Sequence, residues 1–172
     1  MRTIPAFLPA VAVAVLVTAC GSGDNSTEAR EKQLEEYARE HGVNADIELD
    51  GDGQVTIQQN VAGGSVTTGQ DLSVPDDFPT DVAIYPGMKI MSSAATPGGY
   101  MLQGQAAASG EAVAGFFGSE MARQGWRDES PQAPAGLPMT SLRFAKDQRT
   151  TGINLIPDGD RVTIQIMITP SG

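Results

Sequence analysis

The segment RVTIQIMIT, residues 161–169, constrains the fold of this chain more than any other. Apolar residues alternate along it with mostly polar ones, Val162, Ile164, Ile166 and Ile168 against Thr163, Gln165, Met167 and Thr169. Such alternation predicts a β-strand with one buried face and one exposed face, as in an antiparallel sheet. The rest of the chain must therefore supply neighbouring strands and a layer that covers the apolar face.

The covering layer is predicted at residues 109–125, SGEAVAGFFGSEMARQG. Apolar residues recur there on one face of a helix that begins at Ser109, namely Val113, Phe116, Phe117 and Met121. Gly125 is placed to end the helix in a left-handed conformation, with Trp126 reaching back to Met121 as in a Schellman motif. We predict a helix-on-sheet core of Trp126, Phe116, Phe117, Ile164 and Ile166, and the alternative is that these aromatic residues line a pocket.

Four further strands are predicted around this helix. A turn at Tyr85-Pro86-Gly87 leads into a strand through Ile90, and its hairpin partner begins at the glycine pair Gly98-Gly99. Residues 139–147 and 150–160 carry the other two strand patterns. The resulting order, β-β-α-β-β-β, predicts an α+β domain over residues 81–172, an antiparallel sheet with one helix on one face.

The preceding residues predict a charged helix and a β-hairpin. Residues 27–42 have helix composition and few apolar positions, with Asn25 and Glu28 as a capping box and Gly42 as the C-terminal stop. Residues 45–80 predict a hairpin around the turn sequence DGDG, followed by a connector rich in Gly, Ser, Thr and Pro. The alternative for part of the connector is that residues 65–69 add a third short strand.

The charge balance excludes several partners. The full chain has a net charge of −10, and removing residues 1–19 takes away Arg2 alone, which leaves 10 basic and 21 acidic side chains and a net charge of −11. Nucleic-acid binding needs a basic surface, and so does electrostatic docking on anionic lipid. We therefore expect no nucleic-acid partner.

The first residues have the layout of a secretory signal. Arg2 precedes an apolar run over residues 4–17, which ends in the small residues Thr18 and Ala19. The run is shorter than a membrane-spanning helix requires and is interrupted by Pro5 and Pro9. A cleaved signal peptide over residues 1–19 is therefore predicted.

The end of this run, Val17-Thr18-Ala19-Cys20, resembles the lipobox of bacterial lipoproteins. The resemblance implies cleavage before Cys20, a diacylglyceryl thioether on its sulfur, acylation of its amine by a fatty acid such as palmitate, and a tether over residues 20–26. Two or three acyl chains hold a protein firmly on a membrane. The alternatives are an inert buried cysteine and a plain signal anchor in which Cys20 is incidental.

The same resemblance implies a location in the bacterial cell envelope. The membrane partner is reached through the lipid on Cys20, and the domain lies on the periplasmic or extracellular side. Gly21 after Cys20 is similar to outer-membrane sorting signals, if the source is Gram-negative.

A second resemblance rests on Tyr85-Pro86-Gly87 and Gly125-Trp126. This layout is similar to the small periplasmic domains of many uncharacterised bacterial lipoproteins, in which a YPG turn precedes a hairpin and a helix ends in GW. The likeness covers about half of the chain. It implies fold and location, and no activity.

The residues predict no catalytic centre and no cofactor. Cys20 has no second cysteine to pair with, and the single histidine, His41, is predicted to interact with the C-terminus of the charged helix. We therefore expect a protein that is not an enzyme.

A metal site is the remaining chemical possibility. Asp50 and Asp52 fit the acidic spacing of a calcium-binding loop, but Gln59 stands where that loop needs a bidentate glutamate. A plain Asp-Gly turn is favoured, with Asp50 and Asp52 kept as calcium candidates.

Two hypotheses for the function follow. The first is a non-catalytic envelope lipoprotein that binds an unknown envelope protein or maintains the envelope, through an exposed sheet face or edge such as the strand over residues 161–169. The alternative is a lipoprotein that binds calcium or another small ligand through acidic turns, at Asp50 and Asp52 or at Asp158 and Asp160.

Overall fold

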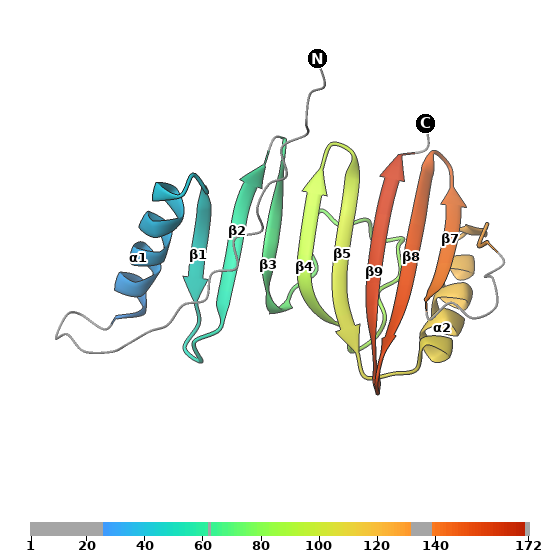
Figure 1. Cartoon of the computed structure of the whole chain (residues 1–172). Coiled ribbons are helices and arrows are strands. Elements are labelled where there is room, and N and C mark those ends of the chain that lie inside the picture. The colour runs from blue at the N-terminus through green and yellow to red at the C-terminus, as the bar shows by residue number, and fades with distance from the viewer. Residues whose placement is uncertain (1–25, 62, 132–138, 171–172) are drawn as a thin grey trace, which may run out of the picture.

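A computed structural model of the chain describes residues 26–61, 63–131 and 139–170. The described residues form two helices and nine strands, shown in Figure 1. In chain order these are α1 (Thr27–Glu40), β1 (Ala45–Leu49), β2 (Val55–Val61), β3 (Gly64–Leu72), β4 (Lys89–Thr96), β5 (Gly99–Ala106), α2 (Gly110–Arg123), β6 (Arg127–Asp128), β7 (Thr140–Lys146), β8 (Arg149–Asp158) and β9 (Arg161–Pro170).

The strands form one open sheet in the order β1-β2-β3-β4-β5-β9-β8-β7-β6, and all neighbours are antiparallel. The predicted α+β class is therefore confirmed, although strands dominate it. The element order differs from the prediction because the two-residue strand β6 follows α2, and because β1 to β3 extend the same sheet instead of forming a separate hairpin. Figure 1 shows α1 beside β1 at one end of the sheet and α2 near β7 at the other.

The connector predicted over residues 60–80 contains a full strand. The alternative of a third strand over residues 65–69 is confirmed, and β3 extends beyond it, from Gly64 to Leu72. It pairs with β2 on one side and β4 on the other. Residues 66–68 are valine and two threonines, which favour extended backbone, so the prediction of a plain linker over this part is wrong.

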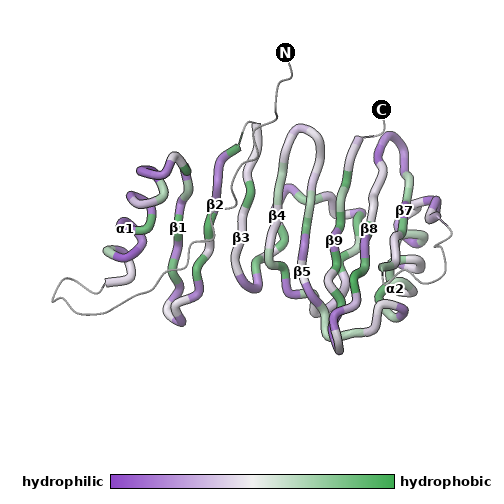
Figure 2. The backbone as a smooth tube through the Cα atoms, in the orientation of Figure 1, coloured by the Kyte–Doolittle hydropathy of each residue, from purple (hydrophilic) through white to green (hydrophobic). Residues whose placement is uncertain are grey.

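The core lies between one face of the sheet and a layer made of α2 and residues 73–88. Val113, Phe117 and Met121 of α2 are fully buried, and Ile164 and Ile166 of β9 lie in the same cluster. Trp126 also belongs to it, while Phe116 contacts it and is only partly buried. The predicted core is thus confirmed. Figure 2 shows hydrophobic residues recurring along β8 and β9 and on α2.

Both ends of α2 follow the prediction. The Ser109 hydroxyl accepts a hydrogen bond from the amide of Ala112, which caps the N-terminus. Gly125 has a φ of +84°, and the Trp126 amide donates to the Met121 carbonyl at 2.9 Å. This is the Schellman motif, and it holds Trp126 against the core.

The ends of α1 are partly as predicted. The cap at its N-terminus is Ser26, whose hydroxyl accepts from the amide of Ala29, whereas Asn25 of the predicted capping box lies outside the described residues. Gly42, with a φ of +79°, ends the helix. The ring Nδ1 of His41 lies 2.8 Å from the Tyr37 carbonyl oxygen, so the predicted interaction with the helix C-terminus is confirmed.

In the part of the chain that the structure describes, no helix is long and apolar enough to cross a membrane. Residues 1–19, with Val17, Thr18 and Ala19, and the predicted lipidation site Cys20 lie outside the described residues.

Candidate functional site

The face of the sheet opposite α2 is left uncovered by the described elements over β4, β5, β9, β8 and β7, and we call it the uncovered face. Register places the outward side chains of these strands in rows across the sheet. One row, the amide row, consists of Ser92, Gln103, Gln165, Asn154 and Ser141. The row beside it, the methionine row, consists of Ala94, Met101, Met167, Gly152 and Arg143.

Neighbouring side chains on this face are hydrogen-bonded to one another. Ser141 Oγ donates to Asn154 Oδ1 at 2.8 Å, and Gln165 Nε2 donates to Gln103 Oε1 at 3.4 Å. The first bond joins the consecutive strands β7 and β8, and the second joins β5 and β9, which are distant in sequence. Both bonds use only part of each amide's capacity. The amide row therefore presents a fixed set of donors and acceptors to a partner.

The charge of the uncovered face differs from that of the whole chain. The two rows contain no acidic side chain and one basic one, Arg143, in a chain of net charge −10. Met101 and Met167 are 39% and 43% exposed and lie opposite each other. The rows share with protein–protein interfaces the depletion of Asp, Glu and Lys and the presence of Met and Arg, whereas their Ser and Ala residues are types that interfaces use less.

A hollow of about 590 Å³ lies near the ends of β4, β5 and β9. Lys89, Arg161, Gln105 and Met91 are among the residues that line it. Lys89 Nζ lies 3.6 Å from an Asp71 carboxylate oxygen, an exposed pair that contributes little to stability. Arg161 forms no ion pair with a described residue, so the charged side chains that line the hollow, Asp71, Lys89 and Arg161, leave one positive charge.

The strand over residues 161–169 is not at an edge of the sheet. β9 pairs with β5 on one side and with β8 on the other. The hypothesis that a partner adds to the edge of this strand is therefore wrong, because both of its hydrogen-bonding sides are already used. Its outward residues Thr163, Gln165 and Met167 contribute to the uncovered face instead.

The acidic calcium candidates lie in turns. The Asp50 carboxylate accepts hydrogen bonds from the amides of Asp52 and Gln54, at 2.9 and 2.8 Å, so it is engaged by its own turn. Asp158 is the last residue of β8, and Asp160 follows Gly159 in the turn that leads to β9. Among the described residues, no group of three His, Cys, Asp or Glu side chains is arranged to hold a metal ion.

An ion cluster forms around Asp81 from residues that no sequence motif connects. The Asp81 carboxylate accepts from both Nη atoms of Arg149, at 2.9 and 2.6 Å, and from Lys146 Nζ at 2.7 Å. Trp126 Nε1 donates to the Asp81 carbonyl at 2.6 Å, and the Arg149 guanidinium lies 5.1 Å from the centre of the Trp126 ring. These contacts, chiefly the hydrogen bonds from Arg149, lower the pKa of Asp81 to about 2. The cluster holds the segment before β4 against β7, β8 and the end of α2.

No protein-family model, curated protein or solved structure matches the chain significantly.

Proposed function

We propose that this chain is a lipid-anchored protein of the bacterial cell envelope, and that it binds a protein partner through the uncovered face. The anchor is supported by the lipobox-like residues Val17-Thr18-Ala19-Cys20, which follow a signal-like apolar run. The anchor would restrict the domain to a membrane surface, which raises its local concentration near a partner held in the same envelope.

The observation that carries the binding proposal is the composition of the uncovered face. The polar side chains of its two rows are amides, hydroxyls, thioethers and one guanidinium, which recognise a partner by hydrogen bonding and contact area. The face is therefore suited to binding a partner. The partner we propose is another envelope protein.

Replacing Cys20 tests the anchor. Cys20→Ala removes the sulfur that would carry the lipid, so we expect the protein to leave the sedimented membranes and its N-terminal peptide to lack acyl mass. Thr18→Ala keeps a small residue in the lipobox and should leave both properties unchanged. A wild-type protein that is found off the membrane, with an unmodified Cys20, would contradict the anchor.

Crosslinking in cells tests the uncovered face. A photo-crosslinking amino acid at Met101 or Met167 should give one adduct of discrete mass with an envelope protein. The same amino acid at Glu111 or Ala122, on the exposed side of α2, serves as the control and should not give this adduct. Equal adducts at all four positions, or no adduct at the two methionine positions, would show that this face is not the binding surface.

A further inference from the structure

The free side of β1 is covered by a helix and not by a strand. β1 pairs with β2 on one side only, so its other side presents unpaired backbone groups. The amide of Leu49 donates to Glu31 Oε1 at 2.8 Å, and the amide of Ile47 donates to Glu35 Oε1 at 3.3 Å. In a longer sheet, these two amides would donate to the carbonyls of the next strand. The two carboxylates of α1 therefore occupy the positions of those carbonyls.

The attachment of α1 to the sheet is light. None of its residues is buried, and its residues toward β1 are only half-buried, namely Glu31, Leu34, Glu35 and Ala38. Ile47, the buried residue of β1, lies outside the main core cluster. Figure 2 shows that α1 is largely hydrophilic. Separating α1 from β1 would therefore expose no buried residue of α1 and none of the main core cluster.

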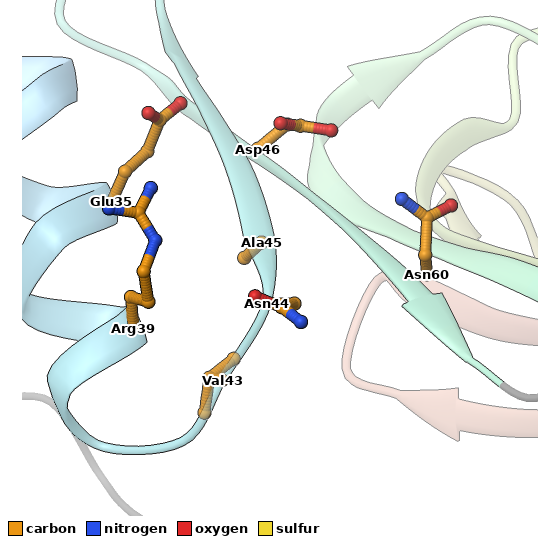
Figure 3. A pocket seen from close by; sticks show the side chains of 7 residues that line it. All are labelled: Glu35, Arg39, Val43, Asn44, Ala45, Asp46 and Asn60. Carbon is orange, nitrogen blue, oxygen red and sulfur yellow. The ribbon is translucent and has the colours of Figure 1, made fainter.

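A hollow of about 300 Å³ separates the C-terminal half of α1 from the sheet. Figure 3 shows Glu35 and Arg39 on its helix side and Asp46 and Asn60 on its strand side. The contact between α1 and β1 is therefore incompletely filled. The hollow is open to solvent, so α1 and the sheet do not pack against each other over their whole length.

We propose that the edge of β1 accepts an extended strand from a partner protein, and that α1 is a cover that the incoming strand displaces. The incoming strand replaces the two carboxylate contacts with backbone hydrogen bonds. This edge is at the opposite end of the sheet from β8 and β7, so the inference does not depend on binding at the uncovered face.

The charges of β1 determine the chemistry of the partner. Ile47 and Leu49 point to one face of the sheet, whereas Asp46 and Glu48 point to the other. Cross-strand neighbours lie on the same face, so the matching segment alternates apolar residues with Lys or Arg. A second copy of β1 does not fit, because an antiparallel pair centred on Ile47 would place Asp46 opposite Glu48 of the other copy. The occupant is thus a basic, alternating segment of another protein.

The test uses the full chain in detergent and a labelled peptide of alternating Lys and Val, with fluorescence anisotropy as the readout. Glu31→Ala/Glu35→Ala removes both contacts and keeps good helix formers, so we expect this variant to bind the peptide roughly tenfold more tightly than the control. The control, Glu36→Ala/Glu40→Ala, has the same spacing and charge change at exposed positions. Adding Leu49→Pro to the first variant removes an edge-facing amide and should abolish binding.

Hydrogen exchange on the wild-type chain provides a second measurement that needs no variant. Saturating peptide should increase exchange in α1 and maintain protection of the Ile47 and Leu49 amides. Unchanged exchange in α1 would overturn the proposal, and so would equal affinities of the two double variants. If a peptide of alternating Glu and Val bound as tightly as the Lys and Val peptide, the argument from charge would be overturned. Dimerisation of the Glu31→Ala/Glu35→Ala variant without peptide would identify a second copy of the chain as the occupant.

Discussion

Phe117→Ala is expected to lower the free energy of unfolding by about 3 to 5 kcal/mol, the range for truncation of a buried phenylalanine. Phe117 is fully buried in the middle of α2, where the helix contacts β8. The substitution removes apolar contacts and leaves a cavity that the surrounding strands cannot close. Domains of this size are stable by about 5 to 15 kcal/mol, so the loss is a large part of the total. Urea denaturation followed by circular dichroism measures it.

Phe116→Ala is the matched control, because it changes the same residue type at the next position of the same helix. Phe116 is only partly buried and makes edge contacts with Tyr85 and Phe117, at ring-centroid distances of 5.1 and 5.4 Å. Its truncation should cost about half as much, since less surface leaves the core. Equal losses for the two variants would contradict the orientation of α2 on the sheet.

Local patterns were sufficient to predict the part of the fold around α2. The helical spacing from Val113 to Met121 and the glycine at position 125 act over a few residues, and the strand over residues 161–169 alternates throughout. In these segments the local preference and the burial in the sheet agree. The helix, its C-terminal motif and the residues of the core could therefore be read from the sequence.

The arrangement of the strands could not be predicted in the same way. β3 is rich in Gly, Ser and Thr and is half-buried or exposed along its length, so it shows no apolar alternation. Its identity as a strand depends on pairing with β2 and β4. Likewise, alternation in β9 indicates one buried face but does not identify the neighbouring strands. One of these neighbours is β5, which is separated from β9 in the chain by α2 and the strands β6 to β8.

The functional surfaces also depend on contacts between distant residues. Gln103 and Gln165 are ordinary outward positions of two strands until register places them side by side on the uncovered face. The hydrogen bonds that β1 amides donate to Glu31 and Glu35 could not be foreseen, because helix composition does not determine which residues the helix contacts. Asp81 lies 65 and 68 residues from its partners Lys146 and Arg149, and no motif connects them.

Asp81→Asn is expected to lower the free energy of unfolding by about 1 to 2 kcal/mol at pH 6. The difference in free energy of unfolding between wild type and variant should become smaller at acidic pH. The pKa of Asp81 is about 2 in the folded protein, below its ordinary value of 3.8, because Arg149 and Lys146 stabilise the carboxylate. The carboxylate therefore stabilises the fold above pH 4, and this contribution disappears as the pH falls from 4 through 2. The Asp81 side chain is 23% exposed, so solvent reduces the effect below the value that the pKa shift alone would give.

Urea denaturation at pH 6 and pH 2.5 measures this difference, with the emission of Trp126, the single tryptophan, as the probe. The Trp126 ring donates to the backbone carbonyl of Asp81, so Asp81→Asn keeps that hydrogen bond and changes only the carboxylate. Asp76→Asn alters an exposed carboxylate of the same segment and should have little effect at either pH. If Asp81→Asn and wild type lost the same stability between pH 6 and pH 2.5, the cluster would not be the source of the acid sensitivity. The segment before β4 would then be held to the sheet chiefly by burial of its apolar side chains, among them Phe78, Val82 and Met88, which does not depend on pH.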